Sequence, residues 1–342
     1  MNVMILWELK KIFKSKTGLI VLALLVFLCG VMGLVKTTLE TENSYRNDKY
    51  ELIIDSRPEK DISQEKLNNK IAVIQGMANN DGVDDFSLKM REVSKDKLKS
   101  IKSMEYEDVS FFKGFNHRAA HPFMLIVMVI ILVLIFSNIY TDERVSGVDN
   151  IILPSKYKFK ALYAKLGLAI ILPIVIYGFY LGIEFLITLV QYGIPVSGEL
   201  GAFRIVDNGA LLNGAFTINE YLLLKIGTMI LIFISISVFS SFFSFITKNS
   251  LESISGTLIF IIFGKVSTLM KFLPDTFLSI LSKGNYVDLM FYPNKFVGMY
   301  SGNVNVFGMN LELINLCNGL LITTMFSGIA LCVFTFKKIL TR

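Results

Sequence analysis

Six long apolar runs alternate with polar segments along this chain. Crossing the hydrocarbon core of a bilayer takes about 20 apolar residues of α-helix, and each run approaches that length with few charges. The pattern therefore predicts an all-α integral membrane protein with six transmembrane helices. The expected spans are residues 17–35, 121–140, 166–190, 221–246, 253–273 and 311–336.

The first 16 residues follow a different pattern, in which apolar positions are mixed with lysines. A helix with one apolar side and one basic side lies in the headgroup plane. We therefore predict an interfacial helix over residues 1–16, anchored by Trp7, Lys10 and Lys11. The alternative is the start of a signal peptide, but the next apolar run is too long for one and no A-x-A-like cleavage site follows.

Residues 36–120 are rich in charges of both signs. The apolar residues from Leu52 to Met77 recur at roughly helical spacing, and Asn79-Asn80-Asp81-Gly82 is a strong turn signal. A second helical stretch follows over Phe86–Met104. We predict a helical hairpin inserted between the first two spans, outside the cytoplasm; a partly disordered loop is the alternative.

Composition and charge agree with a membrane protein. Mean hydropathy is +0.57, and 53% of the residues are hydrophobic. Lysine and arginine collect on the cytoplasmic side of membrane proteins. They precede the first span, fill residues 141–165 and follow the sixth span, whereas residues 191–220 contain only Arg204. Both termini are therefore expected in the cytoplasm, and the net charge of +6 needs no nucleic acid to explain it. Residues 274–310 are expected as an outer interfacial segment of short helices.

Residues 141–165, between the second and third spans, are the most motif-like part of the chain. Their pattern predicts the end of one transmembrane helix, then a short amphipathic helix along the membrane surface, and then a basic segment that leads into the next transmembrane helix. Such a segment is well placed to dock into a soluble partner. Its marked positions are Glu143, Gly147, Ile151, Ile152, Leu153, Pro154, Ser155, Lys156, Lys158, Lys160 and Lys165.

This loop resembles the one that follows the second span in ABC-2-type transporter permeases. The resemblance implies a permease that binds no cofactor, with two ABC ATPase subunits supplying the ATP and Mg²⁺ sites. It also implies a second permease copy or a paralogue. Ile151–Leu153 would sit in a groove of the ATPase, Glu143 would hold the loop in register, and Gly147 and Pro154 would delimit a short lever helix. The insertion at residues 36–120 is a departure from simple drug-exporting members.

The resemblance leaves the cargo open. Permeases of this type export amphipathic peptides such as phenol-soluble modulins from bacterial cells, and the outer hairpin fits amphipathic or lipid-like cargo better than polysaccharide. Bacteriocin immunity and drug efflux are the other options. A membrane sensor or scaffold, with a ligand-binding outer hairpin, is the alternative from another class.

Several polar residues fall inside the expected spans. Glu184 is a candidate path residue, although its place near the outer end would also let it reach water. Gly178 and Gly182 favour a close helix contact. Ser237, Ser241 and Ser244 share one helical face, which suits either helix packing or a polar path.

Two further patterns do not support an enzyme. His117 and His121 are four residues apart but lack the glutamate of a zinc-protease motif, so we expect the start of a span rather than a metal site. The segment from Gly256 to Ser267 has the wrong spacing for a phosphate-binding loop. ATP hydrolysis is therefore not expected in this chain.

Overall fold

The computed structural model describes the whole chain except residues 1, 47–50, 271–272, 293–296, 307 and 341–342. Parts of the predicted fifth span and outer segment fall on residues 271–272, 293–296 and 307, which lie outside the described residues. Within the described residues, six helical segments are long and apolar enough to cross a membrane. The predicted number of spans is therefore confirmed.

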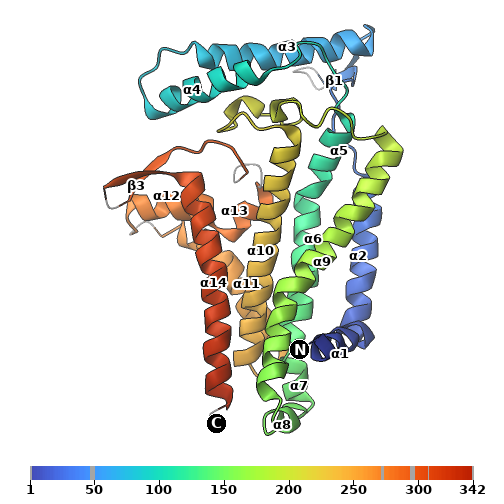
Figure 1. Ribbon diagram of the computed structural model, residues 1–342, viewed down its shortest axis with the longest axis vertical. Coiled ribbons are helices and arrows are strands. Elements are labelled where there is room, and N and C mark those ends of the chain that lie inside the picture. The colour runs from blue at the N-terminus through green and yellow to red at the C-terminus, as the bar shows by residue number, and fades with distance from the viewer. Residues whose placement is uncertain (1, 47–50, 271–272, 293–296, 307, 341–342) are drawn as a thin grey trace.

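The six spans form one bundle (Figure 1). Helix α10 is central, because it packs against α6, α9, α11 and α14. The helices α5, α6 and α7 follow one another within a single apolar segment. The bundle helices are α2 Lys16–Leu34, α5 Ser110–Ala119, α6 Pro122–Asn138, α7 Thr141–Val145, α9 Lys158–Tyr192, α10 Ile218–Ile246, α11 Ser250–Ser267 and α14 Leu313–Leu340.

The two ends of the bundle are built differently (Figure 1). At one end, here called the α1 end, lie helix α1 (Asn2–Lys14), α7, α8 (Asp149–Ile152) and the end of α14. At the opposite end, the hairpin end, α3 (Glu59–Ala78) packs on α4 (Asp85–Ser100). The two helices predicted for residues 36–120 are thus present, with the second ending at Ser100 rather than Met104.

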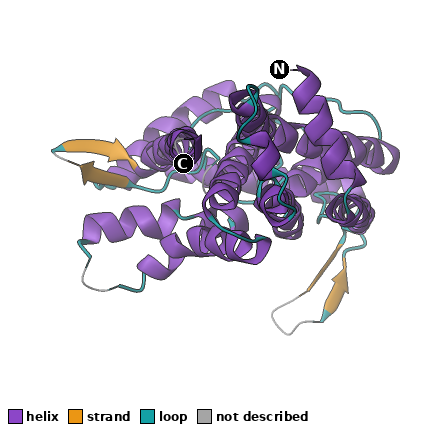
Figure 2. Ribbon diagram, turned by 90° about the horizontal axis from the view of Figure 1, so that it is seen from below, coloured by secondary structure: helices purple, strands orange, loops and turns teal. Residues whose placement is uncertain are grey.

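Two short strand pairs depart from the predicted all-α class. β1 (Ser44–Arg46) pairs with β2 (Leu52–Ile54), and β3 (Asn303–Val306) pairs with β4 (Met309–Glu312), both antiparallel. They project from different sides of the bundle (Figure 2). Strands of three or four residues are too short to give the alternating pattern by which a strand is recognised.

Several helix boundaries also differ from the predicted spans. Helix α9 begins at Lys158 rather than Leu166, so the basic residues before the third span already lie on a helix. Helix α11 runs without a break through Gly264 and Lys265 and ends at Ser267, before the predicted end of the fifth span at residue 273. The outer segment contains α12 (Asp275–Gly284) and α13 (Tyr286–Phe291), and two single turns, η1 (Ala202–Arg204) and η2 (Gly209–Leu211), precede α10.

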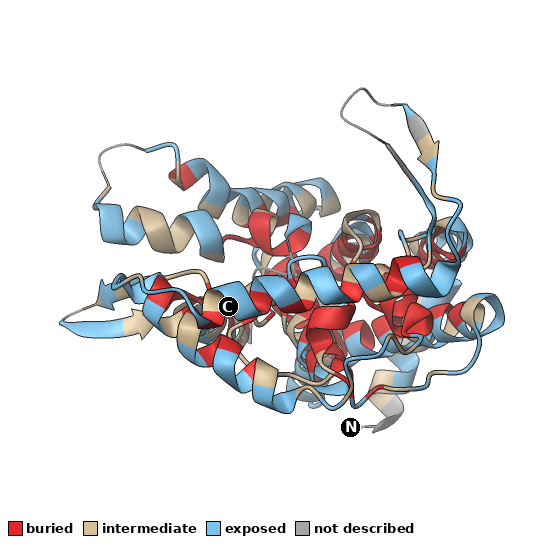
Figure 3. Ribbon diagram, turned by 90° about the horizontal axis from the view of Figure 1, so that it is seen from above, coloured by how far each residue is buried: buried red, intermediate tan, exposed pale blue. Residues whose placement is uncertain are grey.

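Burial is greatest along α6 and least along α11 and α14. In the most apolar window of each span, 72% of the residues around α6 are buried, against 22% for α11 and for α14. The buried positions gather in the middle of the molecule and the exposed ones face outward (Figure 3). Helices α11 and α14 therefore leave several large apolar side chains exposed, such as Ile259 and Phe263 in α11 and Phe326 and Phe334 in α14.

Candidate functional site

A network of four charged side chains ties three helices together at the α1 end. Oε1 of Glu143 in α7 accepts from Nζ of Lys11 in α1 at 2.8 Å and from Nζ of Lys165 in α9 at 2.7 Å. Lys165 also donates to Oε1 of Glu8 at 2.6 Å. Lys165 is fully buried and Glu143 is 3% exposed. Two acids and two bases make this Glu143 network formally neutral.

The opposite side of α7 is held by the end of α10. The backbone N–H groups of Tyr140 and Thr141 donate to Oγ of Ser244 at 3.0 and 3.1 Å. The guanidinium of Arg144 donates to the carbonyls of Phe245 and Thr247. The adjacent residues Glu143 and Arg144 thus contact different helices: Glu143 binds side chains of α1 and α9, and Arg144 binds carbonyls at the end of α10. Helix α7 therefore connects α1, α9 and α10.

The predicted coupling patch lies next to this junction. Gly147 has φ +68°, in the left-handed region that glycine adopts most easily. The N–H of Val148 then donates to the carbonyl of Glu143 at 2.9 Å, which folds the chain back on α7. In the short helix α8, Ile151 is 74% exposed. Ile152 and Leu153 are half-buried, and Pro154 is exposed.

Helix α1 buries part of its apolar side, since Ile5, Leu9 and Ile12 pack against the core of the bundle. Leu6, Trp7 and Phe13 are exposed. The three predicted anchors make different contacts. Nζ of Lys10 lies 5.5 Å from the centroid of the Trp7 ring, whereas Nζ of Lys11 donates to Glu143.

Toward the hairpin end, Glu184 does not reach water, contrary to one sequence-based interpretation. It is fully buried in α9, and its Oε2 lies 3.7 Å from Nε of Arg118 in α5. Arg118 also donates to Thr188 Oγ1 and Gln191 Oε1, and to the carbonyls of Gly33 and Val35. This Arg118 cluster (Arg118, Glu184, Thr188 and Gln191) joins α2, α5 and α9. Sequence reasoning missed Arg118, because it lies at the end of a segment interpreted as a polar insertion.

The remaining span residues have local roles. No other helix of this chain packs closely on Gly178 or Gly182, since a Cβ at either position would meet no described atom of another element within 4 Å. Ser237, Ser241 and Ser244 are all fully buried. Ser241 donates to the carbonyl of Ser237, and the Ser237 hydroxyl has no partner among the described residues.

The two histidines stand at the break between α5 and α6. Their ring centroids are 4.9 Å apart. Nδ1 of His121 accepts from the N–H of Phe123, so His121 caps α6, and Pro122 occupies the first turn as expected. The part of the chain that the structure describes contains no group of three or more potential metal ligands.

Comparisons of the chain with protein-family models, curated proteins and solved structures gave no match. Function therefore has to be inferred from the geometry of the molecule itself.

Proposed function

We propose that this chain is the transmembrane permease subunit of an ATP-driven ABC exporter. Two separate ATPase subunits would bind ATP and Mg²⁺ and dock at the α1 end. A second permease copy or a paralogue would complete the path. Amphipathic peptides, or other hydrophobic cargo, would leave a bacterial cell through it.

The observation that carries the proposal is the position of Ile151 beside the Glu143 network. An exposed apolar side chain on a four-residue helix suits a groove in a soluble partner. The same helix follows α7, which buried charges tie to α1 and α9. Removing one partner of a buried ion pair destabilises a protein by about 3–5 kcal/mol. A push on α8 would therefore move α7 and α9 together, whereas Lys11, whose side chain is 44% exposed, would let α1 shift against them.

Orientation in the membrane is supported by charge. Lysines of α1, of the α8–α9 connection and of the end of α14 gather at the α1 end (Figure 1). By the positive-inside rule this end faces the cytoplasm, and the α3–α4 hairpin lies outside the cell. The exposed Leu6, Trp7 and Phe13 of α1 would then lie among the lipid headgroups.

Affinity purification tests the proposal directly. The tagged chain would be isolated from native membranes in mild detergent, and its companions identified by mass spectrometry. We expect a stoichiometric ATPase with a phosphate-binding loop. A well-folded chain that purifies without one would contradict the proposal.

Mutation of the docking surface tests its detail. Ile151→Asp and Ile152→Asp should leave insertion intact and abolish stimulation of the partner's ATPase activity, as should Glu143→Ala. Val83→Asp is the matched control, because Val83 is 87% exposed at the hairpin end and should have no effect. Full stimulation by the Ile151 and Glu143 variants would exclude a coupling role.

A membrane sensor or scaffold is the second candidate, and the hairpin end favours it. Two cavities of about 660 and 360 Å³ open there, a size typical of ligand sites. A sensor would purify with a signalling protein instead of an ATPase, so the same experiment separates the two functions.

A further inference from the structure

The smaller cavity at the hairpin end has an unusual buried cation in its wall. It has a volume of about 360 Å³ and lies among α5, α10 and the loop between η1 and η2. Lys225 of α10 lines it and is only 2% exposed. Its Nζ donates to Oδ1 of Asn116 at 2.7 Å and to the Asn116 carbonyl at 3.3 Å. Among the described residues no carboxylate forms an ion pair with it within 4.0 Å.

The surroundings of Lys225 neutralise its charge only in part. Asn116 lies near the C-terminus of α5, where the helix dipole supplies roughly half a negative charge. The acid that lines this cavity, Asp207, has a 90% exposed side chain and pairs with Lys113. Nδ1 of His117, in the same wall, is buried without a partner among the described residues. A buried cation without full compensation is costly, so this compartment is suited to an anion.

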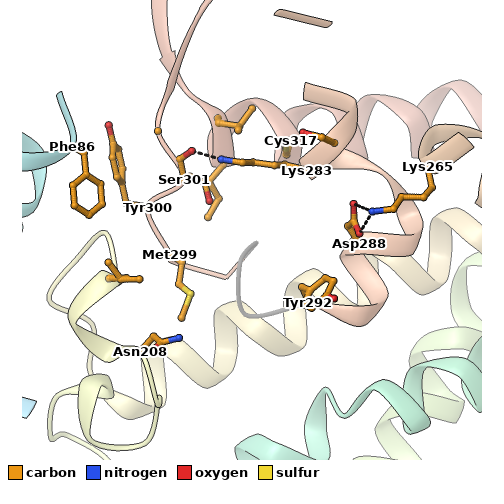
Figure 4. Close-up of a pocket in the computed structure, with 15 residues that line it drawn as sticks. Phe86, Asn208, Lys265, Lys283, Asp288, Tyr292, Met299, Tyr300, Ser301 and Cys317 are labelled. Atoms are coloured by element: carbon orange, nitrogen blue, oxygen red, sulfur yellow. Dashed lines mark hydrogen bonds and ion pairs between the residues drawn. The ribbon is translucent and has the colours of Figure 1, made fainter. Parts of the chain in front are cut away.

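The larger cavity, of about 660 Å³, adjoins this compartment. Asn208, Tyr292 and Met299 line both cavities. Figure 4 shows Phe86 and Tyr300 side by side at the opposite wall, with their ring centroids 5.9 Å apart. Leu211, Leu313 and Ile314 add further apolar surface, and the Lys265–Asp288 ion pair and Lys283 add charged groups. A polar, cationic compartment thus continues into one that has an apolar wall beside charged groups.

The apolar part of the lining favours a lipid-like ligand over a peptide. Lys225 is seven residues inside α10, about 10 Å along the axis at 1.5 Å per residue. A peptide would bring backbone amides that the wall of Phe86, Leu211 and Leu313 cannot satisfy.

We propose that the two cavities together bind an anionic amphiphile with one acyl chain. The carboxylate or phosphate headgroup lies against Lys225 and His117, and the chain lies between Phe86, Tyr300 and Met299. This site does not depend on an ATPase, so it stands or falls separately from the proposed transport function.

Binding to the purified chain in detergent tests the site. The probes are a long-chain fatty acid, a lysophosphatidic acid, a fatty alcohol of equal length and inorganic phosphate. The two acidic amphiphiles should bind at least tenfold more tightly than the alcohol or phosphate. Equal binding of the alcohol, or of free phosphate, would overturn the proposal. Displacement of both lipids by an acidic amphipathic peptide at lower concentration would also overturn it, assigning the site to peptides.

Two variants locate the binding. Lys225→Gln keeps a donor to Asn116 and should weaken fatty-acid binding at least tenfold, whereas Lys248→Gln, at the α1 end, should not change it. If Lys225→Gln fails to fold, Met299→Trp is used instead. It narrows the junction of the cavities and should weaken long-chain binding tenfold. Unchanged affinity in the folded variant would refute the assignment.

Discussion

The Glu143 network and the Arg118 cluster are both buried groups of charge, yet they are built in opposite ways. In the Glu143 network, acids and bases meet directly at 2.6–2.8 Å, and Lys11 keeps a side chain that is 44% exposed. In the Arg118 cluster, the ion pair is longer, at 3.7 Å, and both partners are at most 1% exposed. Arg118 makes its hydrogen bonds to neutral oxygens instead.

The difference indicates different mechanical roles. A network with one edge open to solvent can exchange a partner for water during a movement. A fully buried arginine that satisfies carbonyls of another helix cannot, because each freed group would stay unpaired. We therefore interpret the Arg118 cluster as a fixed clamp on α2, α5 and α9, and the Glu143 network as a joint that moves.

Removing the clamp should have the largest effect. Arg118→Met leaves Glu184 buried without a cation and removes one donor each from the carbonyls of Gly33 and Val35. We expect a loss of about 3–5 kcal/mol in the free energy of unfolding, measured by thermal unfolding of the purified protein. The double variant Arg118→Met/Glu184→Gln should recover part of this loss. Equal losses in the single and double variants would mean that the ion pair contributes nothing.

Neutralising the joint should cost less and act locally. Glu143→Gln leaves Lys165 its bond to Glu8 and lets Lys11 turn to solvent. We expect about 1–3 kcal/mol of destabilisation and faster hydrogen exchange in α1. Exchange near Gly33 should stay unchanged. An equal increase of the exchange rate in α1 and near Gly33 would show that the Glu143 network and the Arg118 cluster are not independent.

The corner between α1 and α2 offers a test without any change of charge. A Cβ at Gly18 would lie 2.0 Å from the Ile12 carbonyl oxygen, whereas one at Gly30, also in α2, would meet nothing within 4 Å. Gly18→Ala should therefore destabilise the protein by about 1–3 kcal/mol. Gly30→Ala should be neutral or stabilising, since alanine favours helix. The unfolding temperatures of the two variants are compared by thermal unfolding. Equal unfolding temperatures would contradict close packing of the α1–α2 connection at Gly18.

The α3–α4 hairpin provides the mildest test, through pH. Burial lowers the pKa of Lys97 to about 8, from an ordinary value of 10.5. Its Nζ donates to the carbonyl of Ala210 at 2.7 Å. Because the folded state binds the proton less tightly, stability should rise with pH between about 8 and 10.5, by roughly 1.4 kcal/mol per unit at most. Lys97→Met should abolish this rise, as measured by denaturation at pH 7, 8 and 9; an identical pH profile in both proteins would exclude Lys97 as its source.

The charge clusters show how far sequence reasoning reached. Glu143 and Lys165 could be singled out, because they border apolar runs where charges are conspicuous. Their partner Glu8 could not, since it is one polar residue in an amphipathic helix 157 positions away from Lys165. Arg118 was missed for the same reason: its significance comes from Glu184, on a helix that approaches it only in the folded chain.

By itself, the sequence determined the membrane class, the six spans and the helix pair between the first two. These follow from hydrophobic length and periodicity, which are properties of neighbouring residues. Only the tertiary structure decided which charges are paired and which side of α1 faces the bundle. It also decided that the positive charge of Lys225 is compensated only in part. Burial and pairing depend on segments far apart in the chain, and their energies change with a few ångströms of separation.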